Sequence, residues 1–281
     1  MSKPGDKNQI RTAVRDHYAQ AITRKSGCCS PRPVELTAES ADKFVQLSGY
    51  TKEDLARVPE NTTSFGCGNP VSFADVKPGQ TVLDLGSGAG MDLILAAGRV
   101  GPEGRVIGLD MTPEMIEVCR KNLATAGITN AEVRQGVMEE MPVADQETDW
   151  IISNCVINLS PEKEKVFAEA YRVLKPGGRM LISDIVTQDL PDDLRGDMSA
   201  WVGCLAGAEE EADYLRLMED AGFVDVKIVE KLVYDRAALG ALAGDASGCC
   251  SGNETGEISA DMVEKFADRV ASVRVSARKA E

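Results

Sequence analysis

Strand-like and helix-like segments alternate along the middle of this chain, and that alternation restricts the possible folds more than any other feature. Short apolar runs, typical of buried strands, are separated by segments whose apolar residues have helical spacing. Such alternation predicts an α/β fold with a parallel sheet and helices on both of its faces. The expected strands cover residues 81–86, 105–110, 131–136, 148–154 and 179–186, and the expected helices cover 91–100, 112–126 and 161–174.

The first seventy or so residues have a different character. Residues 7–24 predict an amphipathic helix, because Ile10, Val14, Tyr18 and Ile22 recur at helical spacing. A second short helix is expected over 38–47 and a third after Thr51, with no strand pattern beside them. We therefore expect this region to form a helical cap.

After the fifth expected strand, the sequence predicts a helix at 209–221 and two strand-like stretches at 224–234 and 272–277. A segment rich in Gly, Ala and Ser separates these stretches and contains Cys249 and Cys250. The chain thus divides into an N-terminal helical cap over 1–70, a central domain over 71–235, and a Cys-Cys insert with a final strand of the same sheet over 236–281.

Charge and cysteine usage narrow the class of function. The chain carries 45 Asp and Glu against 31 Lys and Arg, a net charge of −14, which disfavours a nucleic-acid substrate. The start MSKPGDKNQIRT lacks an apolar signal core, and no run of about 18 apolar residues could span a bilayer. We therefore expect a cytoplasmic protein without a membrane partner, whose eight cysteines are thiols. With a single histidine, His17, thiol chemistry is favoured over histidine-based catalysis.

A glycine-rich segment predicts a nucleoside-containing cofactor. The sequence DLGSGAG at 84–90 follows an apolar strand and opens a helix, where glycines allow a tight turn and a close approach of ligand. Asp110 ends the next strand, 20 residues after Gly90, where its carboxylate can accept ribose hydroxyls.

Two features favour S-adenosylmethionine over a nicotinamide dinucleotide. Asp84 stands two residues before Gly86, where a carboxylate can hold the ammonium of a methionine moiety and would repel a pyrophosphate. The sequence VLKPGG at 173–178 closes a helix before the fifth strand. Together, VLDLGSGAG, GLD and VLKPGG resemble the class I methyltransferases. The resemblance implies a Rossmann-like, mostly parallel seven-stranded sheet whose last strand, here 272–277, is antiparallel.

In the class I fold, the segment that follows the third strand lies beside the adenine. Each side chain of that segment could equally belong to an ordinary strand-to-helix loop, whereas Met111 is the stronger candidate for packing on the adenine or ribose. The cofactor-binding residues that we expect are Asp84, Gly86, Ser87, Gly88, Gly90, Asp110, Met111, Gly136, Val137, Met138 and Asn154.

Three cysteines lie where ligands bind in open α/β sheets, beyond the carboxyl ends of the strands. Cys155 directly follows the fourth strand, Cys204 follows the fifth, and Cys67 lies between two glycines in the loop that leads into the domain. Three converging thiols could hold a soft three-coordinate ion, whereas zinc would need a fourth ligand. Cys119 shares a helix face with apolar residues, so we expect it to be a buried packing residue.

The cysteine-containing segments carry a more specific resemblance. ENTTSFGCGNP, SNCVINLSPEKEKVFAEAYRVLKPGG and WVGCLAG resemble the arsenite S-adenosylmethionine methyltransferases, and the similarity runs from the first helix to the last strand. It implies that Cys67, Cys155 and Cys204 bind arsenite or methylarsenite for methylation, in arsenic detoxification. Either Cys28 or Cys29 matches an upstream cysteine of the family. The family also implies thioredoxin or glutathione as a thiol reductant, and we expect a monomer without a resident metal.

The pentapeptide SGCCS occurs twice, at 26–30 and 247–251, and two interpretations of it remain open. The repeat is either a coincidence between two loops or a pair of sites for substrate capture or redox chemistry, formed by Cys28, Cys29, Cys249 and Cys250. Two alternatives to the arsenite function also remain: a class I methyltransferase of a small organic molecule, and a thiol-rich protein that binds soft metals.

Overall fold

The computed structural model describes residues 6–23, 34–35, 50–60, 62–64, 68–189, 206–236, 264 and 266–281. The helix expected at 38–47 lies outside these residues. The same holds for six of the predicted cysteines, Cys28, Cys29, Cys67, Cys204, Cys249 and Cys250. The two cysteines within the described part of the chain are Cys119 and Cys155.

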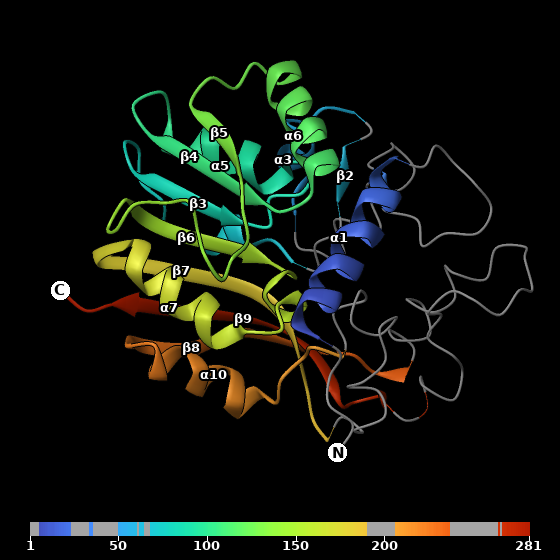
Figure 1. Cartoon of the computed structure of the whole chain (residues 1–281). Helices are drawn as coiled ribbons and strands as arrows, with labels where there is room; N and C mark the ends of the chain where they lie inside the picture. Colours follow the sequence, from blue (N-terminus) through green and yellow to red (C-terminus); the bar gives the residue numbers. More distant parts are fainter. Residues whose placement is uncertain are drawn as a thin grey trace, which may run out of the picture.

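A seven-stranded sheet forms the centre of the molecule, with strand order β5-β4-β3-β6-β7-β9-β8 (Figure 1). All neighbouring strands from β5 to β7 pair in parallel, and β9 alone runs antiparallel, between β7 and β8. This confirms the predicted class I methyltransferase fold. The strands are β3 Thr81–Leu85, β4 Arg105–Asp110, β5 Ala131–Gln135, β6 Thr148–Asn154, β7 Leu174–Thr187, β8 Phe223–Val233 and β9 Val270–Lys279.

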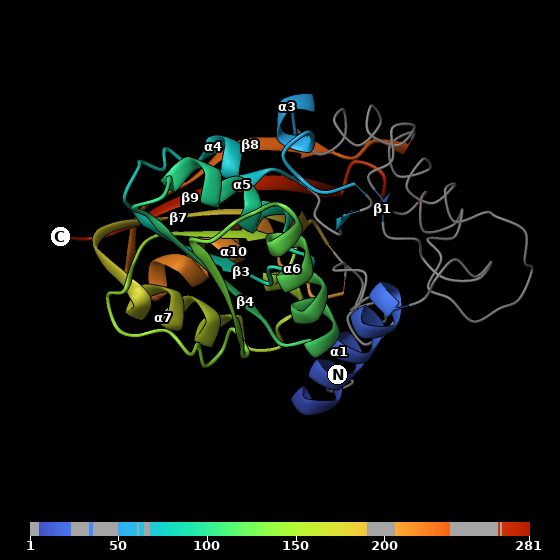
Figure 2. The same ribbon diagram turned by 90° about the horizontal axis from the view of Figure 1, so that it is seen from above.

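Helices cover both faces of the sheet because β3, β4, β6 and β7 carry buried apolar residues on both sides, whereas the edge strand β5 buries only Val133. In Figure 2, α4 and α5 lie on one side of the sheet and α7 lies on the other. Two apolar layers result, one that includes residues of α5 and α6 and one that includes residues of α7 and α10. The helices are α4 Pro70–Phe73, α5 Met91–Val100, α6 Pro113–Thr125, α7 Lys163–Val173 and α10 Glu211–Asp220, with the short 3-10 helix η1 Ile157–Leu159 after β6.

The N-terminal helix α1, Lys7–Thr23, lies beyond the carboxyl ends of the parallel strands (Figure 1). Its apolar face is short: Ile10 and Val14 are buried and pack against Cys155 and Leu159, at and just after the end of β6. The predicted amphipathic helix therefore covers the edge of the sheet at which the candidate site residues gather.

The rest of the described cap is only partly helical. The short helix α3, Lys52–Leu55, begins at Thr51, whose side chain accepts a hydrogen bond from the Asp54 amide in a capping box. A pair of short antiparallel strands, β1 Val34–Glu35 and β2 Thr63–Ser64, was not expected from the sequence. Strands of two residues carry no periodicity, so the pattern of apolar residues could not reveal them.

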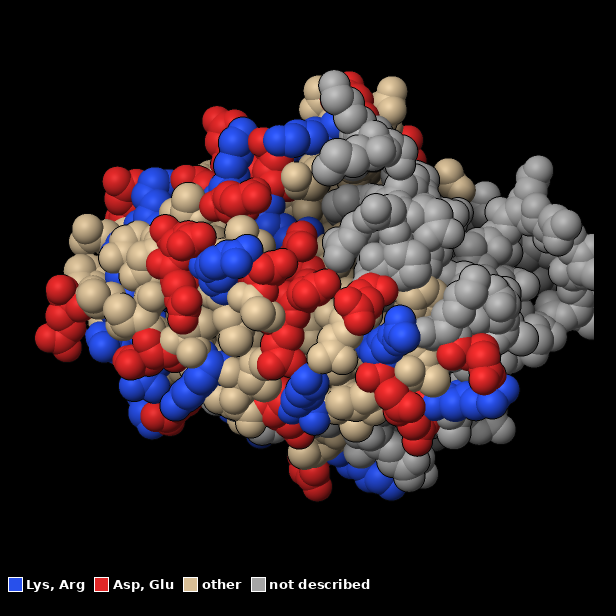
Figure 3. All heavy atoms as spheres, turned by 90° about the horizontal axis from the view of Figure 1, so that it is seen from below, with Lys and Arg blue, Asp and Glu red and all other residues tan. Residues whose placement is uncertain are grey.

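The surface carries charges of both signs. On the face drawn in Figure 3, Lys and Arg side chains are interspersed among more numerous Asp and Glu side chains. Within the described residues, no helix combines the length and the apolar character needed to cross a membrane.

Candidate functional site

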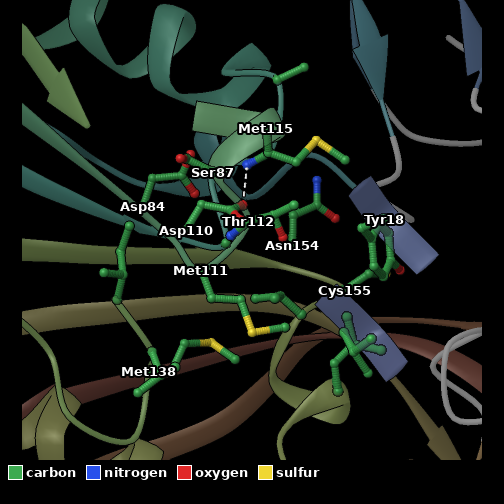
Figure 4. A pocket seen from close by; sticks show the side chains of 18 of the residues that line it. Tyr18, Asp84, Ser87, Asp110, Met111, Thr112, Met115, Met138, Asn154 and Cys155 are labelled. Carbon is green, nitrogen blue, oxygen red and sulfur yellow. Dashed lines mark hydrogen bonds between the residues drawn. The ribbon is translucent and has the colours of Figure 1, made fainter. Parts of the chain in front are cut away.

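A pocket opens at the carboxyl ends of β3, β4 and β6, with α1 as its opposite wall (Figure 4). In the close-up, Asp84, Asp110 and Met111 come from the sheet side, and Tyr18 faces them from α1. The pocket brings together all but one of the predicted cofactor residues, namely Asp84, Gly86, Ser87, Gly88, Asp110, Met111, Gly136, Val137, Met138 and Asn154, and Cys155 lines it as well.

Gly90 is the predicted residue that does not line the pocket. It is the N-terminal cap of α5 in a left-handed conformation, with φ of 92°. A Cβ at this position would lie 2.6 Å from the Cys119 sulfur. Gly90 therefore lets the glycine-rich loop pack on α6, while Gly86 and Gly88, with φ of 65° and 51°, shape the part that faces the pocket.

Asp110 orders the glycine-rich loop from the end of β4. Its carboxylate accepts hydrogen bonds from the Gly88 amide at 3.0 Å and from the Thr112 amide at 2.8 Å. Burial raises the pKa of Asp110, and these backbone donors oppose that effect. Its carboxylate thus holds the two backbone segments that border the pocket, with further acceptor capacity for hydroxyl groups of a ligand.

Asp84 carries a buried carboxyl oxygen that has no hydrogen-bond partner within the described part of the protein. The residue is 2% exposed, and its pKa is raised well above the usual range by burial and by the nearby Asp92 and Asp110. A buried, unpartnered carboxyl in a ligand pocket is best satisfied by a cationic ligand group. The ammonium of a methionine moiety is such a group, so Asp84 fits the predicted cofactor.

A buried polar network that the sequence did not reveal lies behind Asp84. The Tyr50 hydroxyl donates to Asp92 at 2.7 Å, and the Asn154 amide donates to the same carboxylate at 3.0 Å. Burial raises the pKa of Asp92 to about 6. The one available sequence signal was the position of Asp92 in the first turn of α5, directly after the glycine-rich loop, where an acid interacts favourably with the helix dipole.

Helix α1 forms one wall of the pocket, which the sequence did not predict. Arg11, Val14 and Tyr18 line the pocket. Arg11 pairs with Glu139 at 3.1 Å and with Glu162, which also pairs with Lys7 at 3.0 Å. Bonds from Lys165, Arg11 and Lys7 lower the pKa of Glu162 to about 2. An amphipathic pattern shows that a helix buries one face, but it does not show which surface that face covers.

Cys155 has an unusual backbone conformation at the methyl-transfer end of the predicted site. Its φ is 55°, a left-handed value that costs energy for a residue with a Cβ and is typical of functional sites. The Cys155 amide donates to the Ser183 carbonyl at 2.8 Å, which links β6 to β7. Cys155 is 6% exposed and disulfide-bonded, which differs from the free thiol expected from the sequence.

Cys119 has the environment of a packing residue, as predicted. It is fully buried on α6 together with Ile116 and Leu123. Burial raises the pKa of its thiol to about 12, so it is not a thiolate at neutral pH. Among the described residues, no cluster of three or more His, Cys, Asp or Glu could hold a metal ion.

The sequence of this chain is similar to those of known methyltransferases. A family model described as a methyltransferase domain matches residues 76–222. An arsenite methyltransferase from Halobacterium salinarum is 44% identical over 80% of this chain and 60% of its own length. One from Aquipseudomonas alcaligenes is 40% identical over 84% of this chain and 69% of its own length.

Among solved structures, an arsenic(III) S-adenosylmethionine methyltransferase from Chlamydomonas reinhardtii is similar, with a TM-score of 0.60 and 32% identity. The match covers 83% of this chain and 71% of that one. The present chain therefore spans about three fifths to seven tenths of the length of these relatives.

Proposed function

Because this chain belongs to the arsenite methyltransferase family, we propose that it transfers the methyl group of S-adenosylmethionine to trivalent arsenic held by cysteine thiolates. The substrates are arsenite and methylarsenite, and the biological role is arsenic detoxification. The observation that carries this proposal is the position of Cys155. Cys155 lines the same pocket as Asp84 and Asp110.

The pocket residues have complementary tasks toward the cofactor. Asp84 pairs with the ammonium of the methionine moiety, Asp110 accepts the ribose hydroxyls, and Met111 and Met138 pack on the adenosine. When bound, S-adenosylmethionine supplies an electrophilic methyl group. The unpartnered Asp84 carboxyl supports this orientation, because it puts the methionine end beside β3 and thus near the end of β6, where Cys155 lies.

On the substrate side, Cys67, Cys155 and Cys204 are the proposed arsenic ligands. Trivalent arsenic bound by three thiolates keeps a lone pair. That pair would form the arsenic–carbon bond as the methyl–sulfur bond breaks, with S-adenosylhomocysteine as the leaving group, so no proton is removed and no general base is needed. Arsenic is formally oxidised by two electrons in this step, and the thiol reductant supplies two electrons to complete the cycle. The enzyme then works mainly by positioning the arsenic and the methyl group at near-attack distance. Cys155 itself is largely shielded from solvent, with 6% of its surface exposed.

Thiol exchange completes the proposed cycle. We assign Cys28 and Cys29, or one of them, and the pair Cys249 and Cys250 to substrate capture or redox chemistry. Thioredoxin or glutathione restores the thiols between turnovers. The chain acts as a monomer in the cytoplasm.

The deciding experiment incubates the reduced protein with labelled S-adenosylmethionine and arsenite, and separates the arsenic species. Methylated arsenic supports the proposal. Labelled organic product without methylated arsenic would favour a small-molecule methyltransferase, and arsenite binding without any transfer would favour a metal-binding protein. Cys155→Ser and Cys204→Ser should each abolish turnover, because a hydroxyl is a hard ligand and a poor substitute for a thiolate, and Cys67→Ser should be as severe or nearly so. Cys119→Ser is the matched control and should retain most activity.

A further inference from the structure

We propose that Asn154 is a positioning residue, whose carboxamide holds the backbone of Gly68, the residue that follows Cys67 in the chain, at a fixed position relative to Cys155. Gly68 follows Cys67 in the chain, and Asn154 precedes Cys155. The inference rests on the proposed function, in which these two cysteines share one arsenic atom. It gives Asn154 a role within the protein instead of the cofactor contact predicted from the sequence.

Two hydrogen bonds join the Asn154 side chain to the Gly68 backbone. The Gly68 amide donates to Asn154 Oδ1 at 3.1 Å, and Asn154 Nδ2 donates to the Gly68 carbonyl at 2.6 Å. A carboxamide is the side-chain group that offers a donor and an acceptor side by side, as a backbone partner in a sheet does. Two such bonds fix the orientation of Gly68 as well as its position.

The side chain of Ser183 on β7 also packs against Gly68. Gly68 is buried, and a Cβ at this position would collide with the Ser183 hydroxyl, so only glycine fits between β7 and Asn154. The Ser183 carbonyl also accepts the Cys155 amide at 2.8 Å. One residue of a central strand therefore contacts Gly68 and also anchors Cys155.

Asn154 is in turn held by the buried network behind the pocket. Its Nδ2 lies 3.0 Å from the Tyr50 hydroxyl and 3.0 Å from Asp92 Oδ2, in addition to the Gly68 carbonyl. Two amide hydrogens are thus shared among three protein acceptors, and none remains for a ligand. The acceptors also determine which end of the carboxamide is nitrogen, which makes the two-point contact with Gly68 specific.

This arrangement matters because thiolates that share an arsenic atom must be held at a fixed separation. Misplacement of a ligand by about 1 Å can cost about 100-fold in rate. Without the carboxamide, the backbone of Gly68 would lose its two hydrogen bonds to the end of β6. We therefore expect the arrangement to affect arsenic binding more than cofactor binding.

The test measures the proximity of the two thiols directly. In a full-length chain that retains Cys67, Cys155 and the buried Cys119, with the other cysteines replaced by Ser, the reduced protein is treated with a bis-alkylating bimane. This reagent fluoresces only after both arms have reacted with thiols. Asn154→Ala should lower the cross-linked fraction by about fivefold or more, and in the full-cysteine protein it should weaken arsenite binding by about tenfold or more.

Two further variants separate the Gly68 contact from general damage. Tyr50→Phe removes the hydroxyl from the network but leaves both Asn154–Gly68 bonds in place, so it should retain most cross-linking. Gly68→Ala leaves the carboxamide intact but displaces the backbone from Ser183, so it should reproduce the loss. Calorimetry should find that Asn154→Ala weakens arsenite binding more than it weakens S-adenosylmethionine binding, since Asn154 donates to Asp92 and not to Asp84 or Asp110.

The outcomes of the cross-linking assay distinguish failure of this inference from failure of the proposed function. Unchanged cross-linking in both Asn154→Ala and Gly68→Ala would overturn the inference while leaving the proposed function intact. An equal loss in Tyr50→Phe would also overturn it, because the whole network would then be responsible. If the parent chain itself shows no cross-link, Cys67 and Cys155 do not share a site, and the proposed function fails first.

Discussion

Replacement of Asp84 by Asn should weaken cofactor binding and stabilise the free protein, two effects of opposite sign from a single atom. The Asp84 carboxyl is buried with an unpartnered oxygen and two neighbouring acids. An ammonium placed there forms a charge-assisted bond worth about 1.5–3 kcal/mol. Its loss corresponds to about 10- to 150-fold weaker binding of S-adenosylmethionine.

Isothermal titration calorimetry with three ligands makes this prediction specific. S-adenosylhomocysteine carries the same ammonium and should lose the same factor, whereas adenosine lacks the methionine moiety and should bind with unchanged affinity. Asp75→Asn is the matched control, because it removes one negative charge from a side chain that is 70% exposed. An equal loss for adenosine, or unchanged affinity for S-adenosylmethionine, would refute the assignment of Asp84 to the ammonium.

The stability effect follows from the raised pKa of Asp84. A carboxyl whose pKa is higher in the folded state contributes stability at low pH and loses that contribution as pH rises through the folded value. The Asn variant should therefore unfold at higher denaturant concentration than the parent at pH 7. The difference should vanish at about pH 3, where the acid is protonated in both states. A variant less stable than the parent at pH 7 would contradict this reasoning.

Three other outcomes are expected. Asp184→Asn should lower the free energy of unfolding in urea at pH 7 by about 1–3 kcal/mol, because Asp184 is buried and each of its carboxyl oxygens accepts two hydrogen bonds, whereas an amide nitrogen accepts none; a variant as stable as the parent would argue otherwise. Arg11→Ala should speed release of S-adenosylhomocysteine severalfold in stopped-flow measurements, since it removes the ion pairs of Arg11 with Glu139 and Glu162 and leaves only that of Lys7 to hold α1 to Glu162; an unchanged rate would show that these pairs do not help α1 to retain the ligand. Replacing Cys249 and Cys250 by Ser should raise the arsenite concentration for half-maximal rate with little change in the limiting rate, and equal rates at low and high arsenite would leave the capture role unsupported.

Local patterns predicted most of the sheet. The bounds of Arg105–Asp110 and Thr148–Asn154 agree with expectation, because each strand is an apolar run closed by polar residues. Strand β7 begins at Leu174 instead of 179, since Leu174 already pairs with Thr148 while the Lys-Pro-Gly-Gly turn follows. A turn signal marks a change of direction, but it does not show that the residue before it joins the sheet.

From the sequence, we could predict only those residues of the candidate site that lie at the ends of neighbouring strands. Asp84 and Asp110 end adjacent parallel strands, so their proximity follows from topology. The bonds from Tyr50 to Asp92 and from Asn154 to Gly68 join residues 42 and 86 positions apart. No periodicity connects such positions, and their partners become visible only when the cap is packed on the sheet.

The position of β9 has a consequence for how the molecule folds. This strand, the last element along the chain, lies between β7 and β8 and pairs with nine consecutive residues of β7, from Arg179 to Thr187. Until it docks, β7 presents an open edge and β8 has no neighbour, and such edges are templates for aggregation. Closing the sheet requires contacts between segments far apart in sequence, which form slowly. A nascent chain therefore holds an incomplete sheet until residues 270–279 have emerged, and truncation before Val270 should yield an aggregation-prone protein.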